Sequence, residues 1–294
     1  MHSKTGRVDP LDRKITLDRR QLLANLRADA AKDITTSSLF EQGQTATAKI
    51  ISKDEGILAG AEELKTIMGS LVKKCLKDGE PLSKGTVIAE LRGDVKELLG
   101  KERLTLNYLQ ILSGIATETN KLAGVLKHSK LCTLRKGHPG MILNEKRAVQ
   151  IGGGLSHRLN LDDGILIKDN HLAVIAKSQK VPVAKAAKVA VEKLRAKTAK
   201  TGLPIEIEAS DYTVAKSACE AGAKIILLDN LAAEEAKAIA KRLKTNYPNI
   251  LIEASGGITP ENISEYDSEH IDYISSSWII YRAKPLDISM EIVK

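Results

Sequence analysis

Charged and polar residues follow six short apolar runs in the second half of the sequence, each at the point where the run ends. The runs are LCTL, GILI, IEI, KIILL, LIEA and DYI. The residues that follow them include cations, acids, glycines and serines: Arg135, Lys136, Lys168, Glu208, Asp229, Ser255, Gly256, Gly257 and Ser277. Cations neutralise phosphates, whereas acids hold Mg²⁺ or bind sugar hydroxyls. The set favours a substrate with several negative charges and a ribose, and phosphoribosyl transfer as the reaction class.

The segment Ser255-Gly256-Gly257 suits a phosphate, because glycines let backbone N–H groups approach an anion closely. Thr259-Pro260-Glu261 then predicts the start of a helix, with a capping residue, a proline and an acid. The positive end of that helix would add a favourable dipole. A tight turn without any ligand is the alternative interpretation.

The stretch IGGGLSHRLNLDDGILIKDNH, residues 151–171, places an imidazole among cations. His157 and Arg158 are adjacent, and Lys168 follows ten residues after Arg158. The neighbouring positive charges disfavour a metal ion on His157. Neither a Gly-x-Ser-x-Gly elbow nor a P-loop pattern is present, so a nucleophilic triad and an ATP-binding loop are not supported.

Two acids at strand ends are the predicted metal ligands, Glu208 and Asp229. Glu206 would share a strand face with Glu208, since the two are two residues apart. Glu208 lies nearer the C-terminal rim and is therefore preferred. Arg103, in GKERLTLN, is a further candidate, for which a structural salt bridge is the simpler interpretation.

Apolar runs that alternate with helical stretches are typical of parallel βα units. Six or seven such units predict a (β/α) barrel, incomplete in form, with its chemistry at the carboxyl ends of the strands. The helices expected between the strands cover residues 183–200, 211–221, 231–245 and 260–266. The first hundred residues predict a small α+β domain, with elements including helices at 18–31 and 61–76 and a hairpin at 81–94. Residues 96–126 predict two helices or one bent helix around Gly114.

The composition excludes several function classes. Aromatic residues make up only 3% of the 294 residues, which argues against a sheet that stacks RNA bases. No apolar run predicts a membrane span or a secretory signal. The net charge of +8 favours anionic partners, and a solvated lysine-rich helix at 183–200 explains part of it. Three widely spaced cysteines support neither a zinc ribbon nor disulfides, so a cytoplasmic protein is expected.

Long motifs in a fixed order carry a resemblance to a known family. They are ERLTLNYLQILSGIAT, RKGHPG, GGGLSHRLNLDDGILIKDNH, IEIEA, IILLDN, EASGGI, DYIS and PLDI. On these motifs the chain resembles the quinolinate phosphoribosyltransferase family, also called carboxylating nicotinate-nucleotide pyrophosphorylases. The resemblance implies an α/β fold with an N-terminal α/β sandwich domain and an incomplete (β/α) barrel. The implied limits are 1–18 for a polar extension, 19–115 for the sandwich, 116–274 for the barrel and 275–294 for a segment that returns to the sandwich.

The resemblance also implies a reaction and a set of site residues. The family makes nicotinate mononucleotide, pyrophosphate and CO₂ from quinolinate and phosphoribosyl pyrophosphate, with Mg²⁺ and as a homodimer. The residues implied for the quinolinate carboxylates are Arg103 from the neighbouring subunit, Arg135, His157 and Arg158. Those implied for charge neutralisation and for the ribose and metal are Lys136, Lys168, Glu208 and Asp229. Those implied for a phosphate are Ser255, Gly256, Gly257 and Ser277.

Two segments depart from the usual sequence of that family. Gly137 and His138 replace two threonines of Arg-Lys-Thr-Thr-Pro-Gly, and Ser277 and Tyr281 replace a glycine and a histidine of Ser-Val-Gly-Ala-Leu-Thr-His. Two alternatives stay open: a paralogue that uses another acidic acceptor, as in pyrophosphorylase-like proteins found with molybdenum transport, and a catalytically silent protein that binds phosphate or nucleic acid. The retained cations and acids favour the quinolinate enzyme, without a nucleic-acid or membrane partner.

Overall fold

The computed structural model describes Leu11, residues 14–29 and residues 33–293, so the predicted polar extension lies largely outside the described residues. Two compact units make up the chain, and each combines three stretches of sequence. Unit 1 contains residues 1–13, 122–135 and 155–278, and unit 2 contains residues 14–121, 136–154 and 279–294. The domain limits expected above follow chain order, whereas contacts define these units, and those limits stay a prediction.

Unit 1 is built on a parallel sheet of seven strands. They are β6 (Lys130–Thr133), β7 (Leu155–Ser156), β8 (Ile165–Ile167), β9 (Ile205–Ala209), β10 (Ile225–Asp229), β11 (Leu251–Ser255) and β12 (Tyr273–Ser275). Their order is β7-β6-β12-β11-β10-β9-β8, so β7 and β8 form the two edges and the barrel does not close between them. The incomplete barrel is therefore confirmed, and all six apolar runs form strands. The short strand β7 was not predicted, because it has only two residues and directly follows three glycines.

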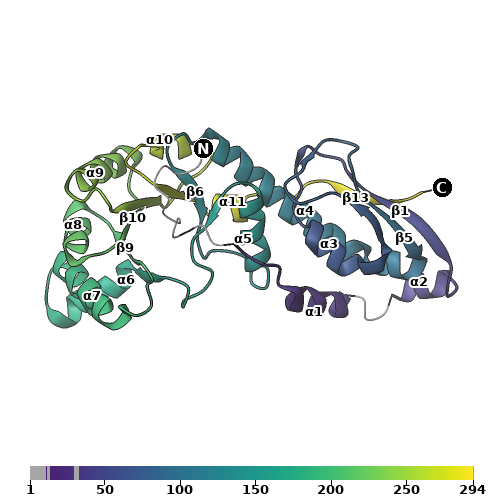
Figure 1. The fold of residues 1–294 in the computed structure, drawn as a ribbon, viewed down its shortest axis with the longest axis horizontal. Helices are drawn as coiled ribbons and strands as arrows, with labels where there is room; N and C mark the ends of the chain where they lie inside the picture. The colour runs from purple at the N-terminus through teal and green to yellow at the C-terminus, as the bar shows by residue number, and fades with distance from the viewer. Residues whose placement is uncertain (1–10, 12–13, 30–32, 294) are drawn as a thin grey trace. The chain divides into compact units, whose positions relative to one another are not determined.

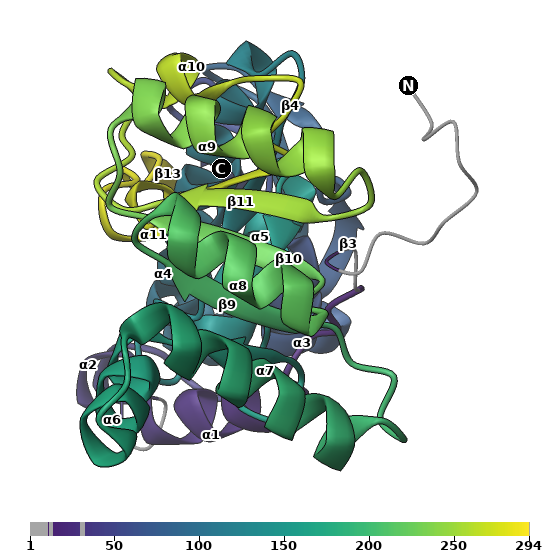
Figure 2. The same cartoon turned by 90° about the vertical axis from the view of Figure 1, so that its left-hand side faces the viewer.

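Helices cover the outer face of this sheet. Figures 1 and 2 show α7 (Val183–Thr198), α8 (Tyr212–Ala221) and α9 (Ala233–Asn246) side by side against β9, β10 and β11. Their buried faces are rich in alanine, which lets the helices lie close to the strands. Unit 1 also contains α6 (Asp169–Gln179) and the one-turn helix α10 (Ile263–Tyr266).

Unit 2 contains an antiparallel sheet in the order β13-β1-β5-β3 and a separate pair of short strands. The strands are β1 (Thr45–Ser52), β3 (Val72–Cys75), β5 (Val87–Asp94) and β13 (Ile288–Ile292), and the pair is β2 (Gly56–Ile57) and β4 (Pro81–Leu82). The helices are α1 (Arg19–Asp29), α2 (Ile34–Leu39), α3 (Ala61–Met68), the 3₁₀ turn η1 (Gly69–Leu71), α4 (Val95–Val125), α5 (Ile142–Ile151) and α11 (Trp278–Tyr281). The last residues of α4 and the first residue of α11 belong to unit 1. Ile50, Leu64, Leu91 and Leu109 join β1, α3, β5 and α4 in one buried apolar core, and Figure 1 shows α3 beside this sheet.

The structure of unit 2 differs from two local predictions and decides between two alternatives for residues 96–126. The helix expected over 61–76 ends at Met68, because Gly69 takes φ 57° and ψ −125°, and β3 follows. The expected hairpin is wrong, since β4 pairs with β2 while β5 pairs with β1 and β3. α4 passes through Gly114 as one helix, and a Cβ atom there would lie 2.3 Å from the carbonyl oxygen of Lys284. The glycine therefore makes room for the C-terminal segment.

α4 has 31 residues, but charged side chains interrupt its apolar positions. Among the residues that the structure describes, neither α4 nor any other helix combines the length and the hydropathy needed to cross a lipid bilayer. Cys75, Cys132 and Cys219 form no disulfide in the described part of the chain.

Candidate active site

The carboxyl ends of the seven strands of unit 1 carry most of the candidate residues. Following the sheet order, these are His157 and Arg158 after β7, Arg135 after β6, Ser277 after β12, Ser255, Gly256 and Gly257 at β11, Asp229 at β10, Glu208 on β9 and Lys168 after β8. Parallel strands bring their carboxyl ends to one edge of a sheet, where barrel enzymes bind their substrates. Arg103, exposed on α4, and the exposed Lys136 belong to unit 2.

Arg135 and Arg158 come together at the ends of the neighbouring strands β6 and β7. Burial lowers the pKa of the Arg158 guanidinium, and repulsion by Arg135 lowers it further. Nη1 of Arg158 donates a hydrogen bond to the carbonyl oxygen of Gly164 at 3.1 Å, which fixes the side chain. An anion placed between the two guanidinium groups would remove their repulsion. This position is therefore suited to a carboxylate or a phosphate.

Lys168 and Glu208 form an ion pair at the ends of β8 and β9. Nζ of Lys168 lies 3.1 Å from Oε1 of Glu208, and the backbone N–H of Asp169 donates to Oε2 at 2.9 Å. The backbone N–H of Lys168 donates to Nδ1 of His171 at 2.9 Å, at the start of α6. Glu208 and Asp229 both line a pocket of about 340 Å³. A lysine that is held beside such a pocket can neutralise an anionic group, and the acids can accept hydrogen bonds from hydroxyls.

Asn230 fixes the glycine loop after β11. Its N–H donates to the carbonyl oxygen of Ser255 at 2.9 Å, and a Cβ atom on Gly256 would come within 2.3 Å of its Oδ1. Gly256 and Gly257 have φ values of 93° and 64°, which side chains rarely allow. Both the backbone conformation and the close approach of Asn230 therefore require glycine at position 256, and the exposed Gly257 leaves the backbone open to an anion.

The helix expected to begin at Thr259 begins later. α10 starts at Ile263 and has four residues. The side chain of Asn262 accepts from the N–H of Thr259 at 2.8 Å and donates to the carbonyl oxygen of Gly257 at 3.1 Å, which closes a turn instead. The prediction that a helix dipole assists phosphate binding at this loop is therefore wrong.

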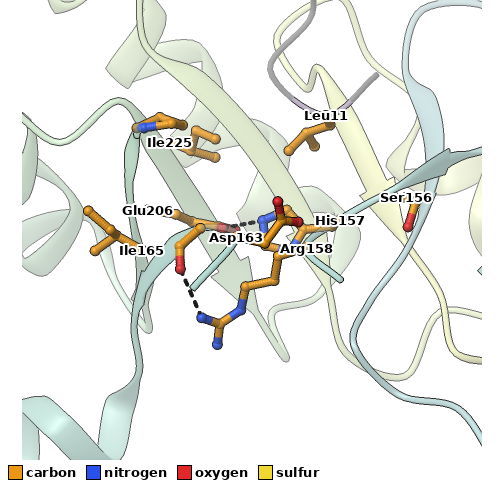
Figure 3. Close-up of a pocket in the computed structure, with 10 residues that line it drawn as sticks. Leu11, Ser156, His157, Arg158, Asp163, Ile165, Glu206 and Ile225 are labelled. Atoms are coloured by element: carbon orange, nitrogen blue, oxygen red, sulfur yellow. Dashed lines mark hydrogen bonds and ion pairs between the residues drawn. The ribbon is translucent and has the colours of Figure 1, made fainter. Parts of the chain in front are cut away.

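A buried histidine meets two buried glutamates inside the barrel. Nε2 of His157 lies 2.5 Å from Oε2 of Glu206, a contact that Figure 3 shows beside Arg158. Oγ of Ser275 donates to Oε1 of Glu253 at 2.5 Å. Each of these four side chains belongs to a residue that is at most 5% exposed. Burial, and then the charge of Glu206, raise the pKa of Glu253 to about 7.

Each of the two glutamates uses only one of its oxygens in these contacts. Within the described residues, Oε1 of Glu206 and Oε2 of Glu253 are buried and have no hydrogen-bond partner. A proton on Glu253 removes one of two neighbouring charges and turns an acceptor into a donor. A cavity of about 20 Å³, which is the space of one water molecule, adjoins His157 and Glu206, and Leu11 forms part of its wall (Figure 3). Leu11 is buried against residues near the starts of the strands, including Ile225.

Two groups of residues offer ligands for a cation. His157, Glu206 and Glu253 have ligand atoms within 4.8 Å of one another, but Arg158 is a neighbouring positive charge, and His157 and Ser275 already bind one oxygen of each acid. Glu208 and Asp229 offer carboxylate oxygens, the donor type of Mg²⁺, beside a pocket with room for water ligands. The second group therefore fits hydrated Mg²⁺ better.

Four residues that build the site were not among the predicted site residues, although three of them stand at strand ends: Asn230, Glu253, Ser275 and Ser276. Ser276 is buried, and its Oγ donates to the carbonyl oxygen of Ile258 at 2.7 Å, which ties the loop after β12 to the loop after β11. An acid within an apolar run, as in LIEAS, was the available signal for Glu253. Nothing in the sequence indicated which of three consecutive serines faces inward.

Comparison with known proteins agrees with this architecture. Models of the N-terminal and C-terminal domains of quinolinate phosphoribosyl transferase match residues 33–113 and 115–291. The probable nicotinate-nucleotide pyrophosphorylase (carboxylating) of Methanothermobacter thermautotrophicus is 37% identical over 91% of this chain and 96% of its own length, and that of Bacillus subtilis is 39% identical over 88% of each. A crystal structure of a NadC deletion mutant is 33% identical, with a TM-score of 0.84 over 95% of this chain and 98% of its own. The chain belongs to the quinolinate phosphoribosyl transferase family.

Proposed function

We propose that the chain converts quinolinate and phosphoribosyl pyrophosphate to nicotinate mononucleotide, pyrophosphate and CO₂ in NAD biosynthesis. The ring nitrogen of quinolinate bonds to the ribose carbon that loses pyrophosphate. The carboxylate next to that nitrogen leaves as CO₂, and the ring carbon that carried it takes up a proton in its place. Family membership and the names of the relatives support this reaction. The observation that carries it is the strand-end arrangement, with two guanidinium groups at β6 and β7 and a lysine–carboxylate pair at β8 and β9.

The arginines are proposed to bind quinolinate. Its two carboxylates stand on adjacent ring carbons, and guanidinium groups bind carboxylates through two parallel hydrogen bonds. Arg135 and Arg158 offer two such groups close together. His157, which is held by Glu206, would add a single hydrogen bond.

The lysines and acids are proposed to serve the transfer step. Lys168 and Lys136 would neutralise the charge that builds on the departing pyrophosphate. Glu208 and Asp229 would bind ribose hydroxyls and stabilise the positive charge that develops on the sugar ring. Ser255, Gly256, Gly257 and Ser277 would hold a phosphate through backbone N–H groups and hydroxyls.

Mg²⁺ is the proposed cofactor, held through water by Glu208 and Asp229, whose oxygen donors suit it. When bound, it would offset part of the pyrophosphate charge. We also propose that the enzyme works in the cytoplasm, which three cysteines without a disulfide support.

Arg103 is proposed to act in the site of the neighbouring subunit of a homodimer. Its place on the exposed face of α4 in unit 2, outside the strand-end cluster of unit 1, supports this assignment. A hybrid of an Arg103→Ala chain and a Lys136→Ala chain should regain activity, because one of its two sites is complete. No recovery in verified heterodimers would contradict the shared site.

The function is tested by product analysis with purified protein, both substrates and Mg²⁺. We expect nicotinate mononucleotide and CO₂ in equal amounts, and loss of both on chelation of the metal. Turnover with another acidic acceptor and none with quinolinate would favour the paralogue. Binding of phosphate or nucleic acid with no turnover at all would favour the silent binding protein.

A further inference from the structure

A buried carboxylate in unit 2 holds the loop that follows Lys136. Glu145, on α5, is 1% exposed. Its Oε1 lies 2.5 Å from Nδ1 of His138, and its Oε2 accepts the backbone N–H of His138 at 3.0 Å. One carboxylate therefore binds both the ring and the backbone of His138. The carbonyl oxygen of His138 in turn accepts the N–H of Met141 at 3.0 Å, so that the loop is closed onto the start of α5.

Gly137 makes this contact possible. A Cβ atom at this position would lie 2.6 Å from Oε2 of Glu145 and 3.1 Å from Cγ1 of Ile142. Because Glu145 is buried and bound twice by His138, it has little freedom to retreat. Any side chain at position 137 would thus displace the carboxylate from His138.

Tyr281 holds the same loop from the C-terminal segment. Its ring meets the ring of His138 edge to face, with centroids 5.3 Å apart and planes at 88°. Its hydroxyl donates to the carbonyl oxygen of Gly137 at 3.4 Å. Two residues next to Lys136 are therefore held from two sides, through Glu145 and through Tyr281.

These contacts join positions that are far apart in the sequence. Gly137, His138 and Tyr281 are three of the positions at which the chain departs from the usual sequence of its family, and the structure brings all three together around Glu145. We propose that this cluster, the His138 clasp, fixes the backbone after Lys136, and that His138 and Tyr281 are positioning residues for the Lys136 ammonium group. The inference rests on the proposed function, in which Lys136 neutralises the leaving pyrophosphate.

The clasp is tested first without turnover. Hydrogen exchange of the amides of residues 137, 138, 140 and 141, measured by mass spectrometry on the whole chain, should become faster in His138→Ala and Glu145→Gln. His138→Asn keeps an N–H donor near the position of Nδ1 and should restore slow exchange. His128→Ala, which removes an exposed imidazole elsewhere, is the matched control. Unchanged exchange in His138→Ala would overturn the clasp.

The positioning role is tested by kinetics with quinolinate and phosphoribosyl pyrophosphate. We expect His138→Ala to lower kcat about tenfold, the value of one charge-assisted hydrogen bond, with both KM values changed less than about twofold. His138→Asn should recover most of kcat, and Tyr281→Phe should lose only about twofold, because its hydrogen bond is long. In a Lys136→Met background, His138→Ala should have no further effect on the residual rate.

The outcomes separate the two hypotheses. If the unaltered chain makes no product, the proposed function fails, while hydrogen exchange still reports on the clasp. If the unaltered chain is active and His138→Ala keeps its full kcat despite faster exchange, the positioning role is overturned. A tenfold loss that persists in the Lys136→Met background would also overturn it, since His138 would then act through some other group.

Discussion

Glu206 and Glu208 stand two residues apart on β9 and share one face of the strand, yet their surroundings differ. Glu206 is 2% exposed and meets His157 inside the barrel. Glu208 is partly exposed at the pocket, where Lys168 and the N–H of Asp169 bind its two oxygens. Two residues of a strand span about 7 Å. That distance separates an acid that serves packing and charge balance from an acid that can reach a substrate.

We call Glu206, inside the barrel, the inner acid and Glu208, at the pocket, the outer acid. The largest expected effect is on stability, at the inner acid. Glu206→Ala takes away the carboxylate that faces the buried His157, and we expect the free energy of unfolding to fall by about 3 kcal/mol. Glu206→Gln keeps an acceptor of nearly the same volume and should lose much less. Urea unfolding followed by circular dichroism measures both. Equal stability of Glu206→Ala and the unaltered chain would remove the distinction between the inner and outer acid.

At the outer acid the expected effect is on rate. Glu208→Ala should lower kcat by about 10²-fold, the usual size for loss of one group that stabilises charge in a transition state. Its stability should change by less than about 1 kcal/mol, because the Lys168 side of the ion pair is exposed to water, which screens the attraction. Steady-state kinetics and urea unfolding on the same preparation test the two statements together. If Glu208→Ala strongly lowered the free energy of unfolding but left kcat unchanged, the roles given to the two acids would be reversed.

The strands and the residues at their ends could be predicted from the sequence, but the contacts between side chains inside the barrel could not. The apolar runs predicted strands, and alternation with helices predicted a barrel, because burial on both faces leaves a strong pattern in parallel strands. Strand-end positions such as Lys168 and Asp229 followed directly from that outline. The pairing of His157 with Glu206 depends on which strands are neighbours in the sheet, and chain order does not fix this. The short turn at Thr259–Asn262 depends on two hydrogen bonds of the Asn262 side chain, which outweighed the capping pattern.

Arg158 sharpens the comparison, because burial and Arg135 lower the pKa of its guanidinium while both Glu206 and Glu208 act to raise it. Arg158→Lys keeps the positive charge but loses the forked donor, so quinolinate should bind about 10- to 100-fold more weakly. Phosphoribosyl pyrophosphate should be affected less. Calorimetric titration of each substrate measures this difference, with Arg195→Lys on α7 as a matched control. Equal losses for both substrates would mean that Arg158 supports the pocket as a whole.

The smallest effect concerns the pH dependence of stability at the second inner acid, Glu253. Its pKa is raised from 4.5 to about 7 in the folded chain, chiefly by burial. Between these values the folded chain holds a proton that the unfolded chain has lost, so the free energy of unfolding falls as the pH rises through this window. The loss is complete above pH 7, where Glu253 has given up its proton in the folded chain as well.

Glu253→Gln should remove this dependence, because an amide stays neutral at every pH. It can still accept from Ser275 and donate to Glu206. We expect the variant to resemble the unaltered chain near pH 5 and to exceed it by about 1–2 kcal/mol at pH 8, a discounted fraction of what the pKa difference allows. Urea unfolding from pH 5 to pH 9 measures both curves, with Glu208→Gln as the control at the outer acid. If the free energies of unfolding of Glu253→Gln and the unaltered chain changed with pH in the same way, Glu253 would hold no more protons in the folded than in the unfolded chain. The contrast between the inner and outer acids would then rest on burial alone.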